Sequence, residues 1–266
     1  MRANRVIWPL ALVGLGVLIL LSNLGFLNGV SVWGIFIPVL LILGGVSVLM
    51  SSFGRARHGE TTGLSIPLEG GESAHLKISY GAGRFTLGDG AASGQLLTGT
   101  FDGGVEHDAR RNGGGLDVTL RGPSDVANGG WWGWDGHERK WDVRLSDRVP
   151  LALEVEVGAA ESRIDLTNVR VTDLKVSTGA SDTKLRMPAR AGQTRAKVSG
   201  GMASIKIDIP EEVAARIEWE GGLSSLDVDT RRFPQDGKFY QSPNYAGAAN
   251  KIDLRIEMGV GSVKVR

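Results

Sequence analysis

Two uncharged apolar stretches open the chain and predict a pair of membrane-spanning helices. They cover residues 6–24 and 30–50. Each is long enough to cross about 30 Å of hydrocarbon at about 1.5 Å per residue, and neither has the polar face of a soluble amphipathic helix. The segment between them is rich in asparagine and glycine, which favour turns. The pattern therefore predicts a transmembrane α-hairpin within residues 1–56.

The charges around this hairpin predict its orientation. Arginines flank only the outer ends of the two stretches, and the connecting turn has neither lysine nor arginine. The positive-inside rule then places the N-terminus and the rest of the chain in the cytoplasm, in a multi-pass membrane protein. A signal peptide is the alternative for the first stretch, although the residues that follow it make a poor cleavage site. The residues that determine this topology are Arg2, Arg5, Arg55 and Arg57.

Beyond a polar segment at residues 57–73, expected to be a linker, one pattern of alternating apolar and polar residues repeats. Each copy has an alternating run, a glycine turn and a second alternating run, and the turn glycines at 158, 179, 201 and 222 are 21 or 22 residues apart. Alternation predicts strands, and a fixed period predicts units that stack. We expect residues 74–266 to form an all-β domain, a right-handed parallel β-helix (a β-solenoid) with about 21 residues per coil. An antiparallel meander is the alternative, because hairpin repeats alternate in the same way.

Parallel stacking would place equivalent residues in rows, and the rows have the composition that stacking requires. The row five residues before the turn glycine and the row six residues after it are apolar, as inward-facing stacks should be. The rows beside them are charged with both signs, which is typical of an exposed face with ion pairs across strands. The apolar rows are Leu76, Leu153, Leu174, Ala196, Ile217 and Leu254, then Leu87, Ile164, Leu185, Ile207, Val228 and Val265.

Two segments break the repeat. Residues 230–249 hold two prolines and are expected to be an inserted loop, and residues 88–149 are rich in glycine and tryptophan and are expected to be irregular. Four clustered tryptophans in the second segment predict either a contact with a partner or the membrane, or a cap over the end of the solenoid. They are Trp131, Trp132, Trp134 and Trp141.

The composition gives no sign of catalytic, cofactor or metal chemistry. The formal net charge is only +1, without the clustered basic face of a nucleic-acid-binding protein. The chain has no cysteine, and its four histidines do not have metal-ligand spacing. Asp165, Asp208 and Asp229 share one predicted row, as the carboxylates of a polysaccharide-acting β-helix enzyme would. We interpret them as ion-paired surface residues, so an enzyme is the remote alternative.

Two stretches of the sequence resemble known families. RVIWPLALVGLGVLILLSNLGFL, followed by WGIFIPVLLILGGVSVL, resembles the LiaI/LiaF-like transmembrane region. Residues 141–188 resemble the toast-rack β domain of bacterial envelope proteins, most specifically in VPLALEVEVGAAESRIDL followed by LKVSTGAS. The two resemblances imply a protein of the bacterial inner membrane and bring no catalytic motif.

The resemblance also implies a function, because LiaF-like proteins are associated with sensing cell-envelope stress and several restrain a sensor kinase. We therefore expect a non-enzymatic regulatory or scaffolding protein, without a cofactor, whose β domain contacts a membrane or cytoplasmic protein. A structural or adhesive envelope protein with an exported β domain is the alternative. Self-association is also expected, since the ends of a solenoid must be capped or paired.

Overall fold

The computed structural model describes residues 61–123 and 139–266. The chain divides into two compact units, Met1–Arg57 and His58–Arg266, and the described residues all belong to the second. The expected hairpin at residues 1–56 and its four arginines lie outside the described residues. Within the described ranges, no helix has the length and hydropathy needed to span a membrane.

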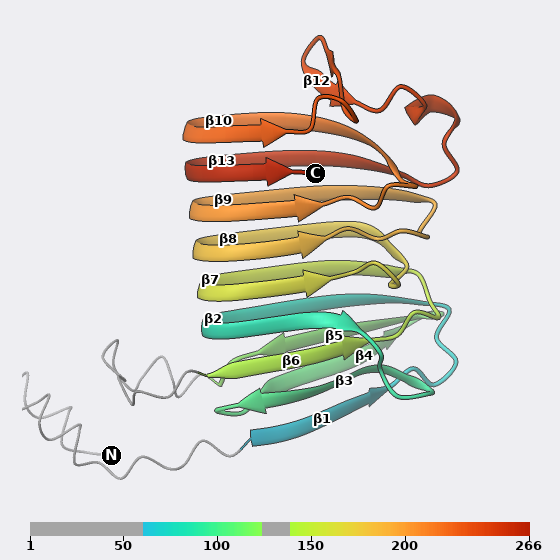
Figure 1. Cartoon of the computed structure of the whole chain (residues 1–266). Helices are drawn as coiled ribbons and strands as arrows, with labels where there is room; N and C mark the ends of the chain where they lie inside the picture. The colour runs from blue at the N-terminus through green and yellow to red at the C-terminus, as the bar shows by residue number, and fades with distance from the viewer. Residues whose placement is uncertain (1–60, 124–138) are drawn as a thin grey trace, which may run out of the picture. The chain divides into compact units, whose positions relative to one another are not determined.

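Six long strands form the rungs of a stack. Each rung bends back on itself near its turn glycine, so that its two halves lie in two layers, here called the first layer (before the bend) and the second layer (after it) (Figure 1). In β7, for example, the inward positions are odd-numbered up to Val157 and even-numbered from Ala160 onwards. The rungs are β2 (Ser73–Asp89), β7 (Leu151–Asp165), β8 (Val171–Arg186), β9 (Gln193–Asp208), β10 (Ala214–Val228) and β13 (Lys251–Val265).

Neighbouring rungs pair in parallel, with equivalent residues opposite one another. Leu153 lies opposite Leu174, and Leu174 opposite Ala196, so these two steps are 21 and 22 residues long. The step from β2 to β7 is much longer, because Leu76 lies opposite Leu153. The all-β, parallel stack is confirmed, and the antiparallel alternative is wrong for the rungs. The right-handed sense of the coil stays a prediction.

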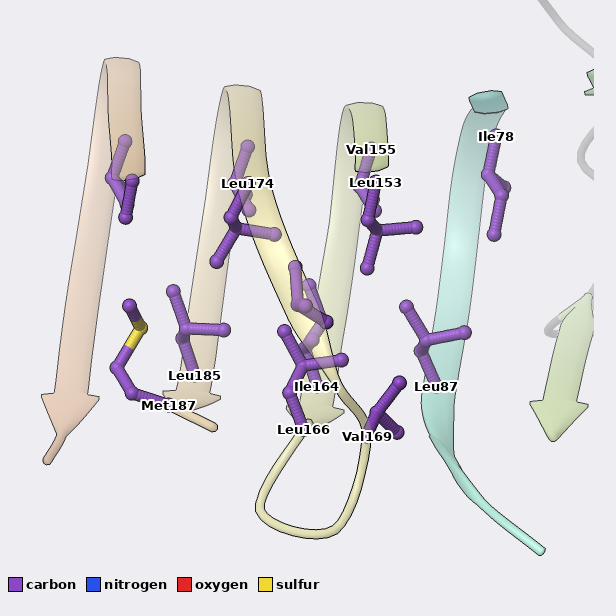
Figure 2. Close-up of a cluster of buried hydrophobic side chains, with 14 of the residues drawn as sticks. Ile78, Leu87, Leu153, Val155, Ile164, Leu166, Val169, Leu174, Leu185 and Met187 are labelled. Atoms are coloured by element: carbon purple, nitrogen blue, oxygen red, sulfur yellow. The ribbon is translucent and has the colours of Figure 1, made fainter. Parts of the chain in front are cut away.

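The two apolar rows predicted from the sequence fill the core between the layers. Figure 2 shows Leu87, Ile164 and Leu185 side by side in the second layer, facing Ile78, Val155 and Leu174 of the first. All members of both rows are buried except Val228, which is partly exposed at the end of the stack. The charged rows beside them pair across rungs: Glu154 lies 2.6 Å from Lys175, and Arg186 lies 3.2 Å from Asp165.

The order of the rungs in the stack differs from their order in the sequence. The observed order is β2, β7, β8, β9, β13, β10, so β13 is inserted between β9 and β10. An inner rung is covered on both sides, so its inward residues are closed off from solvent. In β13 these are Ile252, Leu254, Ile256, Met258, Val263 and Val265, and all are buried.

The segments expected to be linker and irregular contain further strands. β5 pairs with the first-layer half of β2, and β6 with its second-layer half, so these two strands make a rung that is split at the bend. β4 then continues the first layer, whereas β3 and β1 continue the second, all by antiparallel pairing. Their bounds are β1 (Thr61–Pro67), β3 (Gln95–Asp102), β4 (Glu106–Asn112), β5 (Gly115–Arg121) and β6 (Lys140–Leu145).

The insertion at residues 230–249 is an excursion, as expected, with short elements of its own. It holds β11 (Gln235–Asp236), β12 (Phe239–Gln241) and a 3₁₀ turn at Tyr245–Gly247. Phe233 anchors it with a fully buried ring. β12 pairs antiparallel with the first-layer half of β10, so the insertion covers one layer at this end of the stack.

The bend explains the repeated glycine. A Cβ at Gly158 would lie 2.4 Å from the carbonyl oxygen of Gly81, and a Cβ at Gly179 would lie 2.6 Å from that of Gly158. Gly222 and Gly259 approach the backbone of a neighbouring rung in the same way, at 3.0 and 2.7 Å, whereas nothing lies within 4 Å of a Cβ at Gly81. Only glycine fits this approach, so the spacing of glycines in the sequence follows from the stacking of the bends.

Candidate interaction surface

The two layers are closed differently at the two ends of the stack. At one end, both layers continue beyond β2 through short strands, β5 and β4 in the first layer and β6, β3 and β1 in the second. At the other end, β12 and β11 continue the first layer beyond β10 (Figure 1). Among the described residues, no strand continues the second layer there. The second-layer half of β10 is therefore an unpaired sheet edge.

This open edge is the stretch Gly221–Val228. It pairs with β13 on one side, whereas β12 lies opposite only Arg216–Glu218. The N–H of Asp229 donates to the carbonyl oxygen of Val265 in β13, 3.1 Å away. Because successive residues of a strand direct their backbone groups to alternate sides, Ser224, Leu226 and Val228 direct their N–H and C=O groups toward the open side.

The open edge lacks the features that usually protect such strands. Proteins block free edges with charged residues, prolines or very short strands. β4, at the opposite end of the first layer, reads EHDARRN with every residue exposed, and β1 ends at Pro67. The open edge reads GGLSSLDV, with Asp227 as its single charge. It is therefore an edge suited to pair with another strand.

Apolar side chains of the core reach the surface at this edge. Leu226 and Val228 are partly exposed, whereas their opposite neighbours in β13, Val263 and Val265, are 1% and 0% exposed. Trp219 of β10 is also partly exposed and packs against the core. The end of the second layer thus offers apolar surface that a further strand would cover.

Three large apolar side chains stand out from the bends of the last rungs. Leu223 is 84% exposed, Val260 46% and Met202 67%, and they lie opposite one another on β10, β13 and β9. We call these three residues the apolar ladder. The same row contains only alanine in the other rungs, at Ala180, Ala159 and Ala82. The apolar ladder therefore marks the end of the stack that also has the open edge.

The charges near this surface are neutralised within the chain. Arg266 donates to the carboxylate of Asp227, and this hydrogen bond lowers the pKa of Asp227. On the first layer, Arg255 lies 3.0 Å from Glu220, whose hydrogen bond raises the pKa of Arg255. The surface is thus apolar, and the charges beside it are paired within the chain, which suits a protein partner better than a strongly charged ligand.

The four tryptophans separate into two groups. Trp131, Trp132 and Trp134 lie outside the described residues, so their contact with a partner or the membrane stays a prediction. Trp141 is 3% exposed and packs edge-on against Phe101, with ring centroids 4.9 Å apart. A direct contact with a partner or the membrane was wrong for Trp141, because its alternating position in β6 turns it into the core.

The carboxylates that the enzymatic alternative would use do not gather. Asp165 and Asp208 lie on β7 and β9, and Asp229 directly follows β10, so another rung separates each from the next. Each has a cation nearby: Arg186 at 3.2 Å, Lys206 at 3.2 Å and Arg231 at 3.3 Å, respectively. Within residues 61–123 and 139–266, no three acidic or histidine side chains are placed to hold a metal ion.

The sequence held a signal for the apolar ladder but not for the open edge. The row directly after the turn glycine changes from alanine to Met202, Leu223 and Val260 in the last three copies, and this change could have been noticed. The open edge depends on which rung lies at the end of the stack, and β10 and β13 share the same sequence pattern.

Family models identify both parts of the chain. Residues 55–208 match the model described as the N-terminal domain of toast_rack, DUF2154. This chain belongs to the toast-rack family. Residues 7–66 of this toast-rack protein match the LiaF transmembrane domain, so both resemblances found in the sequence are confirmed. None of the curated proteins matches the chain.

Two solved structures match the chain in a structural comparison. A candidate cell adhesion protein from Clostridium sporogenes ATCC 15579 superposes with a TM-score of 0.69 at 19% identity, over 77% of this chain and 99% of that one. This likeness supports the fold alone. A candidate adhesin from Bacteroides fragilis NCTC 9343 has 10% identity and a TM-score of 0.27, over 78% of this chain and 97% of that one.

Proposed function

We propose that this toast-rack protein is a membrane-anchored, non-enzymatic regulatory or scaffolding component of the bacterial cell envelope. The protein acts when the end of its stack contacts a partner protein. The match to the LiaF transmembrane domain supports the membrane anchor. The observation that carries the contact is the apolar ladder, in which Leu223, Val260 and Met202 are exposed side by side.

The proposed topology is a two-helix hairpin with both outer ends in the cytoplasm. It rests on the arginines at positions 2, 5, 55 and 57. The partner would then be a cytoplasmic protein or the cytoplasmic part of a membrane protein, such as a sensor kinase. A reporter active only in the cytoplasm and a reporter active only after export, each fused to Arg266, test this arrangement.

The second candidate is a structural or adhesive envelope protein with an exported β domain. It is favoured by the fold shared with the Clostridium sporogenes protein, whose description refers to cell adhesion. The two candidates predict opposite reporter results. Activity of the cytoplasmic reporter supports the regulatory role, whereas activity of the export reporter contradicts it and favours the adhesive role.

The contact itself can be tested by crosslinking in intact membranes followed by mass spectrometry. Met202→Glu places a charge in the apolar ladder, and Ser204→Glu places the same charge two residues further along β9, at another exposed position. We expect Met202→Glu to lose the main crosslinked partner and Ser204→Glu to retain it, with equal thermal unfolding of both variants. Retention of the partner by both would contradict the contact.

A further variant distinguishes the ladder from the tryptophan cluster. Changing Trp131, Trp132 and Trp134 together to alanine removes the aromatic groups but leaves the ladder intact. If the partner is lost in this triple variant and retained in Met202→Glu, the contact belongs to the tryptophans and the ladder is not the binding site.

A further inference from the structure

We infer that the open edge of β10 binds an extended strand of a partner protein. This strand would lie beyond β10 in the second layer, as β12 does in the first. The inference rests on the proposed function and specifies how the partner binds. Addition of a strand to a free sheet edge is a recurring mode of peptide recognition, in which main-chain hydrogen bonds provide affinity and alternate side chains provide specificity. Three features of this end of the stack favour that mode.

The first feature is that a rung is half complete. β12 occupies the first-layer position beyond β10, where Phe239–Gln241 lie opposite Arg216–Glu218. Its counterpart in the second layer is missing among the described residues. At the other end of the stack, β5 and β6 supply both halves of the corresponding rung. One extended segment at the open edge would supply the second-layer half, so that the rung beyond β10 would have two halves like the rung beyond β2.

The second feature is the set of backbone groups on the open side. Ser224, Leu226 and Val228 direct N–H and C=O groups there, as the hydrogen bond from Asp229 to Val265 indicates. A segment of about eight residues at about 3.3 Å per residue would span Gly221–Val228. Because each unpaired group must otherwise be solvated, an extended backbone is the ligand that matches this row.

The third feature is the chemistry of the side chains around the edge. Inward-facing residues of the incoming strand would pack on Leu226, Val228 and Trp219, which are partly exposed. An outward-facing apolar residue would lie beside Leu223, and Asp227 is already paired with Arg266. The partner segment should therefore have apolar residues at alternate positions, contain no proline and need no charge of its own.

A single strand fits this end better than a second copy of the whole stack. β12 and β11 extend the first layer two strands beyond β10. A complete rung laid on β10 would meet β12 in the first layer, whereas a strand in the second layer would not. Self-association is therefore the alternative outcome of the test.

A synthetic peptide copied from the chain provides the probe. Residues 258–266 (MGVGSVKVR) lie beside the open edge in β13 and pair with β10 from its other side, so the same sequence is suited to the open side. We would measure fluorescence anisotropy of the labelled peptide with the full chain in lipid nanodiscs. Saturable binding is expected, and replacing both Val263 and Lys264 of the peptide by proline should weaken it at least about tenfold, because one of these two N–H groups faces β10 in either strand direction and proline removes it.

Two variants of the chain locate the binding site. Leu226→Lys charges the open edge, and Thr62→Lys charges the exposed β1 edge at the opposite end of the second layer. We expect peptide binding to be lost with Leu226→Lys and kept with Thr62→Lys. No saturable binding, or equal binding by both variants, would overturn the inference. So would concentration-dependent dimerisation of the chain that Leu226→Lys abolishes, since a second copy would then occupy the edge.

Hydrogen exchange in the unmodified chain is a second test, which does not require Leu226→Lys to fold. In the unmodified chain, the peptide should slow exchange at the amides of Ser224, Leu226 and Val228, and unchanged rates there would also overturn the inference. Failure here is distinct from failure of the proposed function. If the peptide does not bind but Met202→Glu still loses the crosslinked partner, contact at the ladder stands without strand addition.

Discussion

At the scale of single residues, the bend glycines set the spacing of the stack. At a closely stacked bend there is room for the Cα hydrogens of glycine but not for a methyl group. The carbonyl oxygen of the neighbouring rung would lie closer to the added carbon than van der Waals contact allows. The separation is 2.4 Å for Gly158, but nothing lies within 4 Å of a Cβ at Gly81. These two glycines occupy the same row. They differ in that the bend of another rung lies against the position of a Cβ at Gly158 but not at Gly81.

This difference predicts unequal effects of one substitution. Gly158→Ala should reduce the free energy of unfolding by about 1–3 kcal/mol, the usual cost of forcing a group into a packed site. Gly81→Ala should be close to neutral. Thermal unfolding followed by circular dichroism at the β-sheet minimum measures both variants. Equal destabilisation by the two alanines would show that the bends do not stack as described.

An ion-paired cluster on the exposed face of the first layer predicts a pH effect. The ammonium group of Lys77 donates to Glu156 at 2.8 Å, and this hydrogen bond is the main cause of the lowered pKa of Glu156. A lowered folded-state pKa stabilises the fold above the unfolded-state pKa of glutamate, and the stabilisation is lost as the pH falls through the folded-state value. Because Glu156 is partly exposed, the contribution should stay below about 1 kcal/mol.

Urea unfolding at pH 7 and pH 3 checks this prediction. The chain should lose less stability between these pH values when Glu156 is replaced by glutamine. The matched control is Glu211→Gln, the same substitution in the exposed loop between β9 and β10. An identical pH dependence in Glu156→Gln and the unmodified chain would contradict the assignment.

At the scale of elements, the position of β13 between β9 and β10 is the feature that most affects the surface. Val265 of β13 and Val228 of β10 occupy the same row and lie opposite each other, but Val265 is fully buried and Val228 partly exposed. The free energy of burying a side chain follows the apolar area removed from water. The order of the strands therefore determines which of the two valines contributes more to the free energy of folding.

We expect Val265→Ala to cost about 2 kcal/mol and Val228→Ala clearly less, since the cavity left at an inner rung is closed on both sides. The two free energies of unfolding, measured by urea titration of the single variants, test the strand order directly. If β13 lay at the end of the stack, as its place in the sequence predicts, the larger cost would fall on Val228→Ala.

The elements also show which parts of the fold could be predicted from the sequence. Alternation and the glycine spacing predicted the rungs, the buried rows and the parallel pairing, because each of these is a local consequence of period-two burial repeated along the chain. Strand order was not predictable in this way, since β10 and β13 carry interchangeable patterns. β4 was not predictable either, because every one of its residues is exposed and it has no buried face to leave a signal.

At the scale of the whole molecule, one end of one layer differs from the others. Within residues 61–123 and 139–266, short strands extend three of the four layer ends beyond the rungs, and the fourth stops at the open edge of β10. The apolar ladder stands at the same end, on β9, β13 and β10. A membrane anchor joined to a domain with one unprotected apolar end is the arrangement expected of a protein that binds another protein.

The proposed function requires that this end of the stack is covered by a partner in the cell. The chain has no cysteine, so single cysteines at Met202, Leu223 and Ala82 report on exposure at one row of bends. We propose to compare labelling rates with a membrane-permeable maleimide in native membranes and in purified chain. Cysteines at 202 and 223 should label several-fold more slowly in native membranes, with equal rates at 82. Equal labelling rates in both preparations at all three positions would show that no partner covers this end of the stack.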